Sequence, residues 1–387
     1  MQKVLVVYGT RPEAIKMAPV VSELQRSTVV EPVVAVTGQH RAMLDQVNSL
    51  FGIEPRHDLD ILTQRQRLED ITSRALDGVS QVIAAEKPAA VLVQGDTTTC
   101  FAAALAAFYG RVPLVHLEAG LRTGDPSNPF PEEINRRLTS HLASLHLAPT
   151  PTSCANLVAE GIARESIVIT GNTVIDALHQ VISQDLPPTD DDLTRVLGAS
   201  QPLVLVTAHR RESWGEPMAN SARAIATLAA RFPHLTFLLP AHLNPAVREI
   251  LLPPLIGLRN VVITEPLCYS DFARAMDRSL VVLTDSGGVQ EEAPSLGKPV
   301  IVMRETTERP EAVAAGTVEL VGTDEHRIVR AVSRLLTDHD AYDEMARAVN
   351  PYGDGRAAAR SVVAIESFLG TGSGPEEFVP ASVAHTV

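Results

Sequence analysis

The sequence lacks any apolar run long enough to cross a membrane. Cysteine aside, the longest uninterrupted run of apolar residues covers nine positions, 101–109, whereas a membrane-spanning helix needs roughly 20. Near the start, only residues 4–8 are apolar before Gly9, so the apolar core of a secretory signal is missing and these residues are expected to form a first strand. The sequence therefore predicts a cytoplasmic protein that does not bind membranes.

Cysteine and basic residues are also scarce. Cys100, Cys154 and Cys268 are far apart and odd in number, which indicates neither a disulfide framework nor a zinc site. Lys and Arg number 33 against 46 Asp and Glu, giving a net charge of −13, which argues against backbone-driven binding to nucleic acids. Any anionic ligand must therefore be met by a local cluster of basic side chains.

What the chain does contain is enough length for two or three domains, with 387 residues of which 45% are hydrophobic. Short β-branched runs alternate with amphipathic helical segments, which is typical of parallel sheets with helices on both faces. Strands are predicted in two sets, near 3–8, 32–37, 89–94, 112–117 and 166–170, and near 203–207, 235–239, 260–264, 280–284, 299–303 and 317–321. The predicted fold class is α/β, with two Rossmann-type doubly wound sheets and a ligand cleft beyond the carboxyl ends of their strands.

A helix start with basic residues follows the first predicted strand. Thr10 and Glu13 fit a capping box, and Pro12 fits the first helical turn. The free N–H groups of such a start form an anion site, which makes Arg11 and Lys16 candidate ligands for a phosphate or carboxylate. An ordinary capped helix with two exposed cations explains this motif alone equally well.

In the second half, the predicted strand 280–284 runs into a glycine-containing turn. Ser286, Gly287 and Gly288 let backbone N–H groups approach a phosphate closely. Glu292 lies about one turn into the following helix, where it can accept hydrogen bonds from ribose hydroxyls. The alternative is a tight turn followed by an acid that the helix dipole favours.

Two further basic motifs stand at strand ends or helix starts of the second half. His209 and Arg210 follow the predicted strand 203–207, and Arg309 begins a second Arg-Pro-Glu triplet. A histidine packed at a strand end, and a coincidental triplet, are the alternative readings. Neither G-x-G-x-x-G nor G-x-x-x-x-G-K-[ST] is present, so neither dinucleotide binding through that fingerprint nor P-loop binding is predicted.

Carboxylates follow strands of the first half. Asp96 comes after the predicted strand 89–94, Glu118 after 112–117, and Glu132 near the start of another helix. Carboxylates facing cations that hold a leaving phosphate would suit proton transfer at a sugar ring, although each acid alone is more often a cap or a surface charge. His116 and Glu118 lack the cysteine pair of a zinc deaminase, so no metal is predicted.

Ten motifs together carry a family resemblance: GTRPEAIKMAP (9–19), TGQHRAMLDQV (37–47), GDTTT (95–99), HLEAGLRTGD (116–125), PEEINR (131–136), TGNTVIDAL (170–178), AHRRE (208–212), LTDSGGVQEEAPSLGKPV (283–300), TTERPEAV (306–313) and NPYGDGRA (350–357). In these motifs, which extend over about residues 3–368, the chain resembles the non-hydrolysing UDP-N-acetylglucosamine 2-epimerases of bacteria. Motifs this long and in this order are far more specific than any short pattern.

The resemblance implies the GT-B architecture, with a first domain at 1–172, a second at 173–355, and a last helix near 356–369 that returns to the first domain. The composition of residues 370–387, rich in Gly, Pro and Ser, predicts a flexible tail. The resemblance further implies interconversion of UDP-GlcNAc and UDP-ManNAc without NAD or metal, a homodimer, and a supply of ManNAc for cell-surface polysaccharide.

Site residues carried over from the family fall into three sets. The catalytic set is Asp96, Glu118, Glu132 and His209. The substrate-binding set is Arg11, Lys16, Asp96, Glu118, His209, Leu267, Phe272, Ser286, Gly287, Gly288, Glu292 and Arg309, in which Leu267 replaces a glutamine of some relatives. A possible allosteric UDP-GlcNAc site comprises Gln39, Arg65, Arg210 and His242, although Ala42 stands where a glutamine is common.

The chemistry of the sugar explains this residue set. The hydrogen on carbon 2 is not acidic until UDP departs, so the resemblance implies elimination to 2-acetamidoglucal and re-addition of UDP after proton return on the opposite face. Three alternatives stay open: a hydrolysing 2-epimerase that releases ManNAc and UDP, a GT-B glycosyltransferase, and a non-catalytic nucleotide-sugar sensor.

Overall fold

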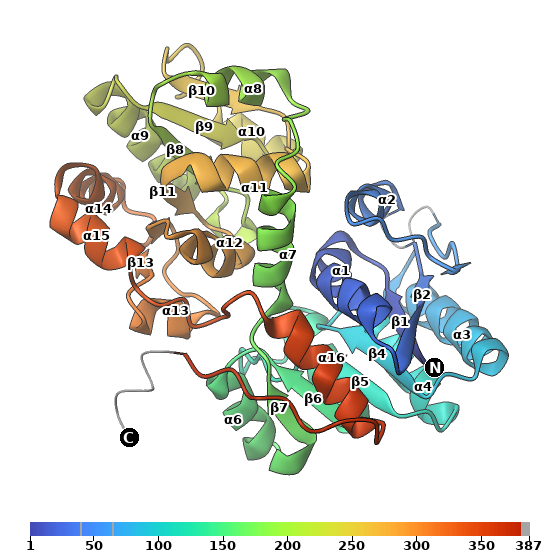
Figure 1. The fold of residues 1–387 in the computed structure, drawn as a ribbon. Helices are drawn as coiled ribbons and strands as arrows, with labels where there is room; N and C mark the ends of the chain where they lie inside the picture. Colours follow the sequence, from blue (N-terminus) through green and yellow to red (C-terminus); the bar gives the residue numbers. More distant parts are fainter. Residues whose placement is uncertain (39–40, 64–65, 381–387) are drawn as a thin grey trace. The chain divides into compact units, whose positions relative to one another are not determined.

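The computed structural model describes residues 1–38, 41–63 and 66–380 (Figure 1). The chain divides into two compact units, which we call unit 1 (Met1–Ala177 with Tyr352–Val379) and unit 2 (Leu178–Pro351, to which Pro380 is also assigned). The chain thus divides at 177/178 and 351/352, whereas the sequence-based limits are 172 and 355. No helix among the described residues is long and apolar enough to cross a membrane.

Unit 1 is built on a sheet of seven parallel strands in the order β3-β2-β1-β4-β5-β6-β7. The strands are β1 (Gln2–Tyr8), β2 (Val30–Val36), β3 (His57–Asp58), β4 (Ala90–Gln94), β5 (Leu114–Leu117), β6 (Leu145–Ala148) and β7 (Ile167–Ile169). Sequence analysis missed β3 and β6. The first has two residues, and the second consists of Leu, His, Leu and Ala, which lack the β-branched signal of the other strands.

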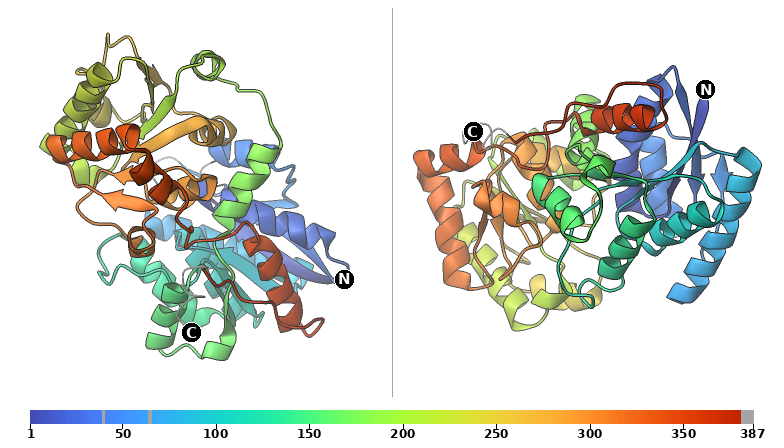
Figure 2. Two further views of the ribbon diagram at one scale, coloured as in Figure 1. Left: turned by 60° about the vertical axis from the view of Figure 1, so that its left-hand side comes forward. Right: turned by 90° about the horizontal axis from the view of Figure 1, so that it is seen from below.

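Helices cover both faces of this sheet: α1 (Arg11–Arg26), α2 (Arg41–Leu50), α3 (Leu68–Glu86), α4 (Thr98–Tyr109), α5 (Glu132–Leu142), α6 (Pro151–Ala159) and α16 (Ala357–Phe368). On one face, α3 and α4 pack on alternate residues of β1 and β4 such as Leu5 and Val91. α1 also packs on the sheet and lies beside α16 (Figures 1 and 2). Sheet residues buried on both faces explain the near-continuous apolar runs in the sequence.

Unit 2 holds six parallel strands in the order β10-β9-β8-β11-β12-β13. They are β8 (Leu203–Thr207), β9 (Thr236–Pro240), β10 (Val261–Thr264), β11 (Ser279–Thr284), β12 (Val300–Val302) and β13 (Val318–Leu320), with helices α8 (Asp191–Gly198), α9 (Glu216–Arg231), α10 (Pro245–Leu251), α11 (Tyr269–Arg278), α12 (Gly287–Glu292), α13 (Pro310–Ala314), α14 (Glu325–Thr337) and α15 (His339–Ala346). The two parallel sheets confirm the predicted α/β class with two Rossmann-like sheets.

The chain passes from unit 1 to unit 2 within α7 (Thr173–Ser183). It returns at Tyr352, and Asp176 of α7 accepts the backbone N–H groups of Ala357 (3.2 Å) and Ala358 (2.8 Å) at the start of α16. The Asp176 carboxylate therefore caps the helix that follows the return of the chain.

The segment after α16 holds fixed contacts. Glu377 pairs with Arg164 (2.7 Å), and the backbone N–H of Phe378 donates to the carbonyl of Ile169 in β7 (2.8 Å). The ring of Phe378 is buried, and the Arg360 guanidinium lies over it. A flexible tail from Gly370 does not account for these contacts, because Glu377 and Phe378 find partners on unit 1.

Candidate active site

A buried carboxylate connects the ends of β1 and β4. Glu13 accepts the N–H groups of Gly9 (3.0 Å) and Thr10 (2.8 Å), which confirms the predicted capping box. Its other oxygen accepts the hydroxyl of Thr97 (2.6 Å), the residue after Asp96. Burial raises the pKa of Glu13. The capping residue of α1 thus also fixes the loop that carries Asp96.

Glu118 directly follows β5 and has a left-handed backbone, with φ of 63°, a conformation that is uncommon for residues with a side chain. Its Oε1 accepts hydrogen bonds from Lys16 Nζ and from Asn172 Nδ2, the latter at 3.0 Å. Its Oε2 accepts one from Gln94 Nε2 at the end of β4. The side chain is almost fully buried, so these donors replace water around the carboxylate.

Asp96 is held by residues of α5. Arg136 donates from Nε and Nη2 to Asp96 Oδ2, at 3.0 and 2.5 Å, and Asn135 donates to the Asp96 carbonyl (2.9 Å). The preceding carbonyl, of Gly95, lies 2.7 Å from His116 Nε2. Because burial lowers the pKa of His116 to about 3, this ring is neutral near pH 7 and donates one proton to that carbonyl.

The adjacent acids of α5 have different surroundings. Glu133 is fully buried and accepts hydrogen bonds from Thr123 N–H, Arg136 and Arg137. Burial would raise the pKa of Glu133, but these donors lower it overall. Glu132, the predicted catalytic residue, is half-buried, and its side chain makes no hydrogen bond or ion pair with another residue of the described chain.

Unit 1 therefore gathers several of the predicted residues. A Cβ added at Gly95 would lie 3.6 Å from Glu118 Oε2, so the loop of Asp96 passes close to the carboxylate that Lys16 contacts. Arg11, the first residue of α1, is half-buried. The carboxyl ends of β1, β4 and β5 are adjacent in the sheet, as expected for a site in this fold.

In unit 2, two histidines and an aspartate follow three adjacent strands. His209 follows β8, His242 follows β9 and Asp285 follows β11. His209 Nδ1 lies 3.1 Å from Asp285 Oδ1, and the rings of His209 and His242 stack with centroids 5.7 Å apart. Burial would raise the pKa of Asp285, but contact with His209 and with backbone N–H groups lowers it overall.

Two arginines converge on the glycine turn of unit 2. A Cβ added at Gly287 would lie 3.2 Å from Arg210 Nη2 and 3.5 Å from Arg309 Cζ. Arg309 is oriented by Glu291 (2.7 Å), and Arg210 Nε is buried without a hydrogen-bond partner among the described residues. The position that a Cβ would take at Gly287 thus faces two guanidinium groups. Ser286 and Gly288 are its neighbours in the same turn.

The remaining predicted residues of unit 2 lie on or near α11 and α12. Glu292 is buried and accepts the hydroxyl of Tyr269 (3.0 Å). Leu267 is buried just before α11, and Phe272 is half-buried within it. Of the possible allosteric set, Gln39 and Arg65 lie outside the described residues.

Sequence analysis missed most of the residues that hold the predicted ones in place, namely Gln94, Arg136, Asn172, Asp285 and Glu291. Several stand inside the family motifs quoted above, so position in a motif was the available signal. Their partners could not be read from the sequence, since Asn172 and Glu118, for example, are 54 positions apart.

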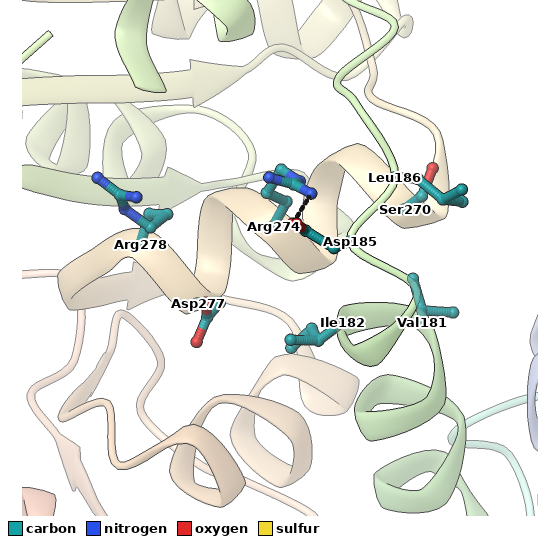
Figure 3. A pocket seen from close by; sticks show the side chains of 8 residues that line it. All are labelled: Val181, Ile182, Asp185, Leu186, Ser270, Arg274, Asp277 and Arg278. Carbon is teal, nitrogen blue, oxygen red and sulfur yellow. Dashed lines mark hydrogen bonds and ion pairs between the residues drawn. The ribbon is translucent and has the colours of Figure 1, made fainter. Parts of the chain in front are cut away.

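A cavity of about 140 Å³ lies elsewhere in unit 2, between the end of α7 and α11 (Figure 3). Arg274 pairs with Asp185 at its wall (2.5 Å), and its other lining residues are Val181, Ile182, Leu186, Ser270, Asp277 and Arg278. None of these eight belongs to the predicted site. Within the described part of the chain, no group of three or more His, Cys, Asp or Glu side chains is arranged to hold a metal ion.

Comparisons with known proteins agree over nearly the whole chain. A family model described as UDP-N-acetylglucosamine 2-epimerase matches residues 22–366. A UDP-N-acetylglucosamine 2-epimerase of Salmonella typhimurium is 52% identical over 373 residues, which cover 95% of this chain and 99% of that protein. The crystal structure of the Neisseria meningitidis UDP-GlcNAc 2-epimerase bound to UDP-GlcNAc has a TM-score of 0.86 and 47% identity, covering 95% and 100% of the two chains. The S. aureus MnaA–UDP structure has a TM-score of 0.88 and 45% identity, covering 98% and 100%.

Proposed function

The chain belongs to the UDP-N-acetylglucosamine 2-epimerase family, and on that premise we propose that it interconverts UDP-GlcNAc and UDP-ManNAc without releasing the free sugar. The reaction proceeds by elimination of UDP to 2-acetamidoglucal and re-addition with inversion at carbon 2. In the cell this activity supplies ManNAc for surface polysaccharide.

The observation that carries the proposal is the pair of carboxylates at the ends of the adjacent strands β4 and β5. Asp96 is paired with Arg136, and Glu118 accepts hydrogen bonds from Lys16 and two side-chain amides. Both carboxylates are oriented by these donors, as a group that takes up a proton at a defined position requires. In the proposed mechanism Asp96, Glu118 and Glu132 transfer the proton at carbon 2.

In the proposed mechanism, residues of unit 2 bind the nucleotide part of the substrate. We assign His209, Arg309 and the backbone N–H groups of Ser286–Gly288 to the diphosphate, whose negative charge grows as the C1–O bond breaks. Glu292, fixed by Tyr269, is assigned to the ribose hydroxyls. Arg11, Lys16, Leu267 and Phe272 complete the proposed substrate contacts.

The order of bond breaking follows from the acidity of carbon 2. Its hydrogen is not next to a carbonyl, so a carboxylate cannot remove it from the intact sugar. When UDP leaves with the C1–O electron pair, positive charge at carbon 1 acidifies the neighbouring C–H bond and a carboxylate takes the proton. Proton delivery to the other face of the glycal and attack of UDP oxygen on carbon 1 complete the inversion.

Proton NMR of UDP-GlcNAc with the enzyme in deuterium oxide, without added cofactor, tests this function. We expect UDP-ManNAc, with deuterium at carbon 2 of both UDP-sugars. Free ManNAc and UDP would instead indicate a hydrolysing enzyme. Tight UDP binding without turnover would indicate a sensor, and inversion without solvent deuterium would exclude proton exchange with the proposed carboxylates.

A homodimer is also proposed. Large apolar side chains are exposed on α4 (Phe108, Tyr109) and on α5 (Ile134, Leu138), and these two helices pack against each other. A surface of this kind is typical of a protein–protein contact. Light scattering should give twice the chain mass, and Leu138→Glu should shift it towards the monomer; a monomeric native chain would contradict the proposal.

We further propose that Arg210 and His242, together with Gln39 and Arg65, bind a second UDP-GlcNAc molecule that activates the enzyme. The rate should then rise sigmoidally with UDP-GlcNAc, and UDP-ManNAc alone should be converted poorly. Hyperbolic kinetics in both directions would contradict activation.

A further inference from the structure

Asn172 directly precedes α7, the helix within which the chain leaves unit 1, and its side chain makes hydrogen bonds at both ends. Its Oδ1 accepts the backbone N–H of Val174 at the start of α7 (3.1 Å), and its Nδ2 donates to Glu118 Oε1 (3.0 Å). The bond to Val174 determines which end of the amide faces Glu118, because only the oxygen can accept from a backbone N–H. The group that meets the carboxylate is therefore a donor.

The backbone around Asn172 is also tied to the returning segment of the chain. The N–H of Asn172 donates to the carbonyl of Tyr352 (2.6 Å), the first residue of unit 1 after the return. The next residue, Thr173, donates its hydroxyl to the carbonyl of Lys16 (2.7 Å). Asn172 thus links the segment before α7 and the returning segment at Tyr352 to one oxygen of Glu118. Thr173 adds a link to helix α1.

Gln94 contacts the second carboxylate oxygen of Glu118. Its Nε2 donates to Glu118 Oε2, whereas Asn172 and Lys16 donate to Oε1. Both amides face Glu118 with N–H groups, which can donate a hydrogen bond but cannot accept one. A protonated carboxyl group would direct its O–H towards a donor, so these contacts favour the ionised form.

We propose that Asn172 is a positioning residue that keeps Glu118 ionised and oriented as a proton acceptor, with Gln94 in the same role on the second oxygen. This inference rests on the proposed function, in which Glu118 transfers a proton at carbon 2. Asn172 itself touches no reacting atom. It acts through Glu118, whose carboxylate it orients by the hydrogen bond from Nδ2.

Other charged and titratable groups of the described chain lie around this carboxylate. The charged ones include Lys16 from α1, Arg136 from α5, and Asp96 and Glu13 at the ends of β4 and β1. The uncharged ones include His116 and the thiol of Cys100, whose pKa is raised by burial. Asn172→Asp leaves all of them in place. It retains an oxygen for the Val174 N–H, but it replaces the donor to Glu118 by a second carboxylate, and like charges at this distance oppose ionisation.

The experiment compares the pH dependence of kcat/KM for the wild type, Asn172→Asp and Gln94→Glu. We expect the acidic limb of both variants to move to higher pH by about one unit or more, with activity partly recovered at high pH. Asn156→Asp is the matched control, because it removes a similar Nδ2 contact, to the Gly120 carbonyl (3.0 Å), without facing Glu118. Its acidic limb should not move.

A second readout does not depend on activity. The side-chain carboxyl carbon of Glu118, assigned by its loss in Glu118→Gln, is titrated by ¹³C NMR in the wild type and in Asn172→Asp. We expect Glu118 to bind its proton at higher pH in the variant. An unmoved titration, or a loss of activity that is uniform across pH, would overturn the inference. Absence of UDP-ManNAc formation by the wild type would instead overturn the proposed function, while the titration still decides the role of Asn172.

Discussion

Asp285 holds His209 by side chain and backbone at once. Its Oδ1 lies 3.1 Å from His209 Nδ1, and its Oδ2 accepts the N–H groups of His209 (2.6 Å) and Arg210 (2.8 Å). Nδ1 is the ring nitrogen on the side of this buried carboxylate, and Nε2 is the one left to meet a ligand. Asp285 therefore sets the position of the imidazole, by its ion pair with the ring and its hydrogen bonds to the backbone.

Asp285→Asn should lower kcat by about 100-fold, because a small displacement of a catalytic group has effects of this size. UDP affinity should change less, since the arginines remain. The check is a double-variant cycle with His209→Asn. If Asp285 acts through His209, the double variant loses little more than the more impaired single one, whereas additive losses would indicate an independent role.

Arg136→Lys should reduce solvent-deuterium incorporation at carbon 2 by ~10-fold or more. Lysine keeps the charge but cannot reproduce the two hydrogen bonds from Nε and Nη2 to Asp96. Arg137→Lys is the control, because Arg137 also pairs with Glu133 but not with Asp96. Equal losses in the two variants would mean that the pairing with Glu133, rather than with Asp96, is what matters.

Gly287→Ala should weaken UDP binding by about tenfold, the size expected from disturbing one charge-assisted hydrogen bond. The added Cβ would lie 3.2 Å from Arg210 Nη2, so the guanidinium must move away. Isothermal titration calorimetry measures the affinity. Gly198→Ala, where a Cβ meets open space in the same unit, should bind UDP as the wild type does. Unchanged affinity in Gly287→Ala would remove this turn from the UDP site.

The free energy of unfolding should fall between about pH 4 and pH 7 because of Asp176. Burial raises the pKa of Asp176 from 3.8 to about 6, so the native state binds this proton more tightly than the unfolded chain. The resulting stabilisation is fully present below 3.8 and is lost as pH rises through about 6. Over this window it amounts to about 2 to 3 kcal/mol.

Asp176→Asn isolates this effect, because every other titrating group is shared with the wild type. Urea denaturation gives the free energy of unfolding of both proteins. The wild-type value minus the variant value should decrease by about 2 to 3 kcal/mol as pH rises from about 4 to about 7. A difference that stays constant with pH would show that Asp176 titrates alike in the folded and unfolded chain.

Local patterns in the sequence predicted a helix start and several strand ends that the structure contains. The capping box of Thr10 and Glu13 is present, and Asp96, Glu118 and His209 do follow strands. The family resemblance is confirmed by the comparisons. What the motifs left open is which neighbouring acid is buried. Glu132 and Glu133 differ only in helical phase, and the surroundings of α5 leave the first half-exposed and bury the second among arginines.

The sequence by itself determined the two parallel α/β sheets and the strand ends on which the functional groups stand, because alternating strand and helix patterns and turn residues act over short stretches of chain. Only the tertiary structure decided which partners those groups have. Asn172 meets Glu118, and Phe378 packs beside β7, through contacts between distant segments. Such contacts depend on strand order and on the placement of each backbone to within a hydrogen-bond length, which no local pattern encodes.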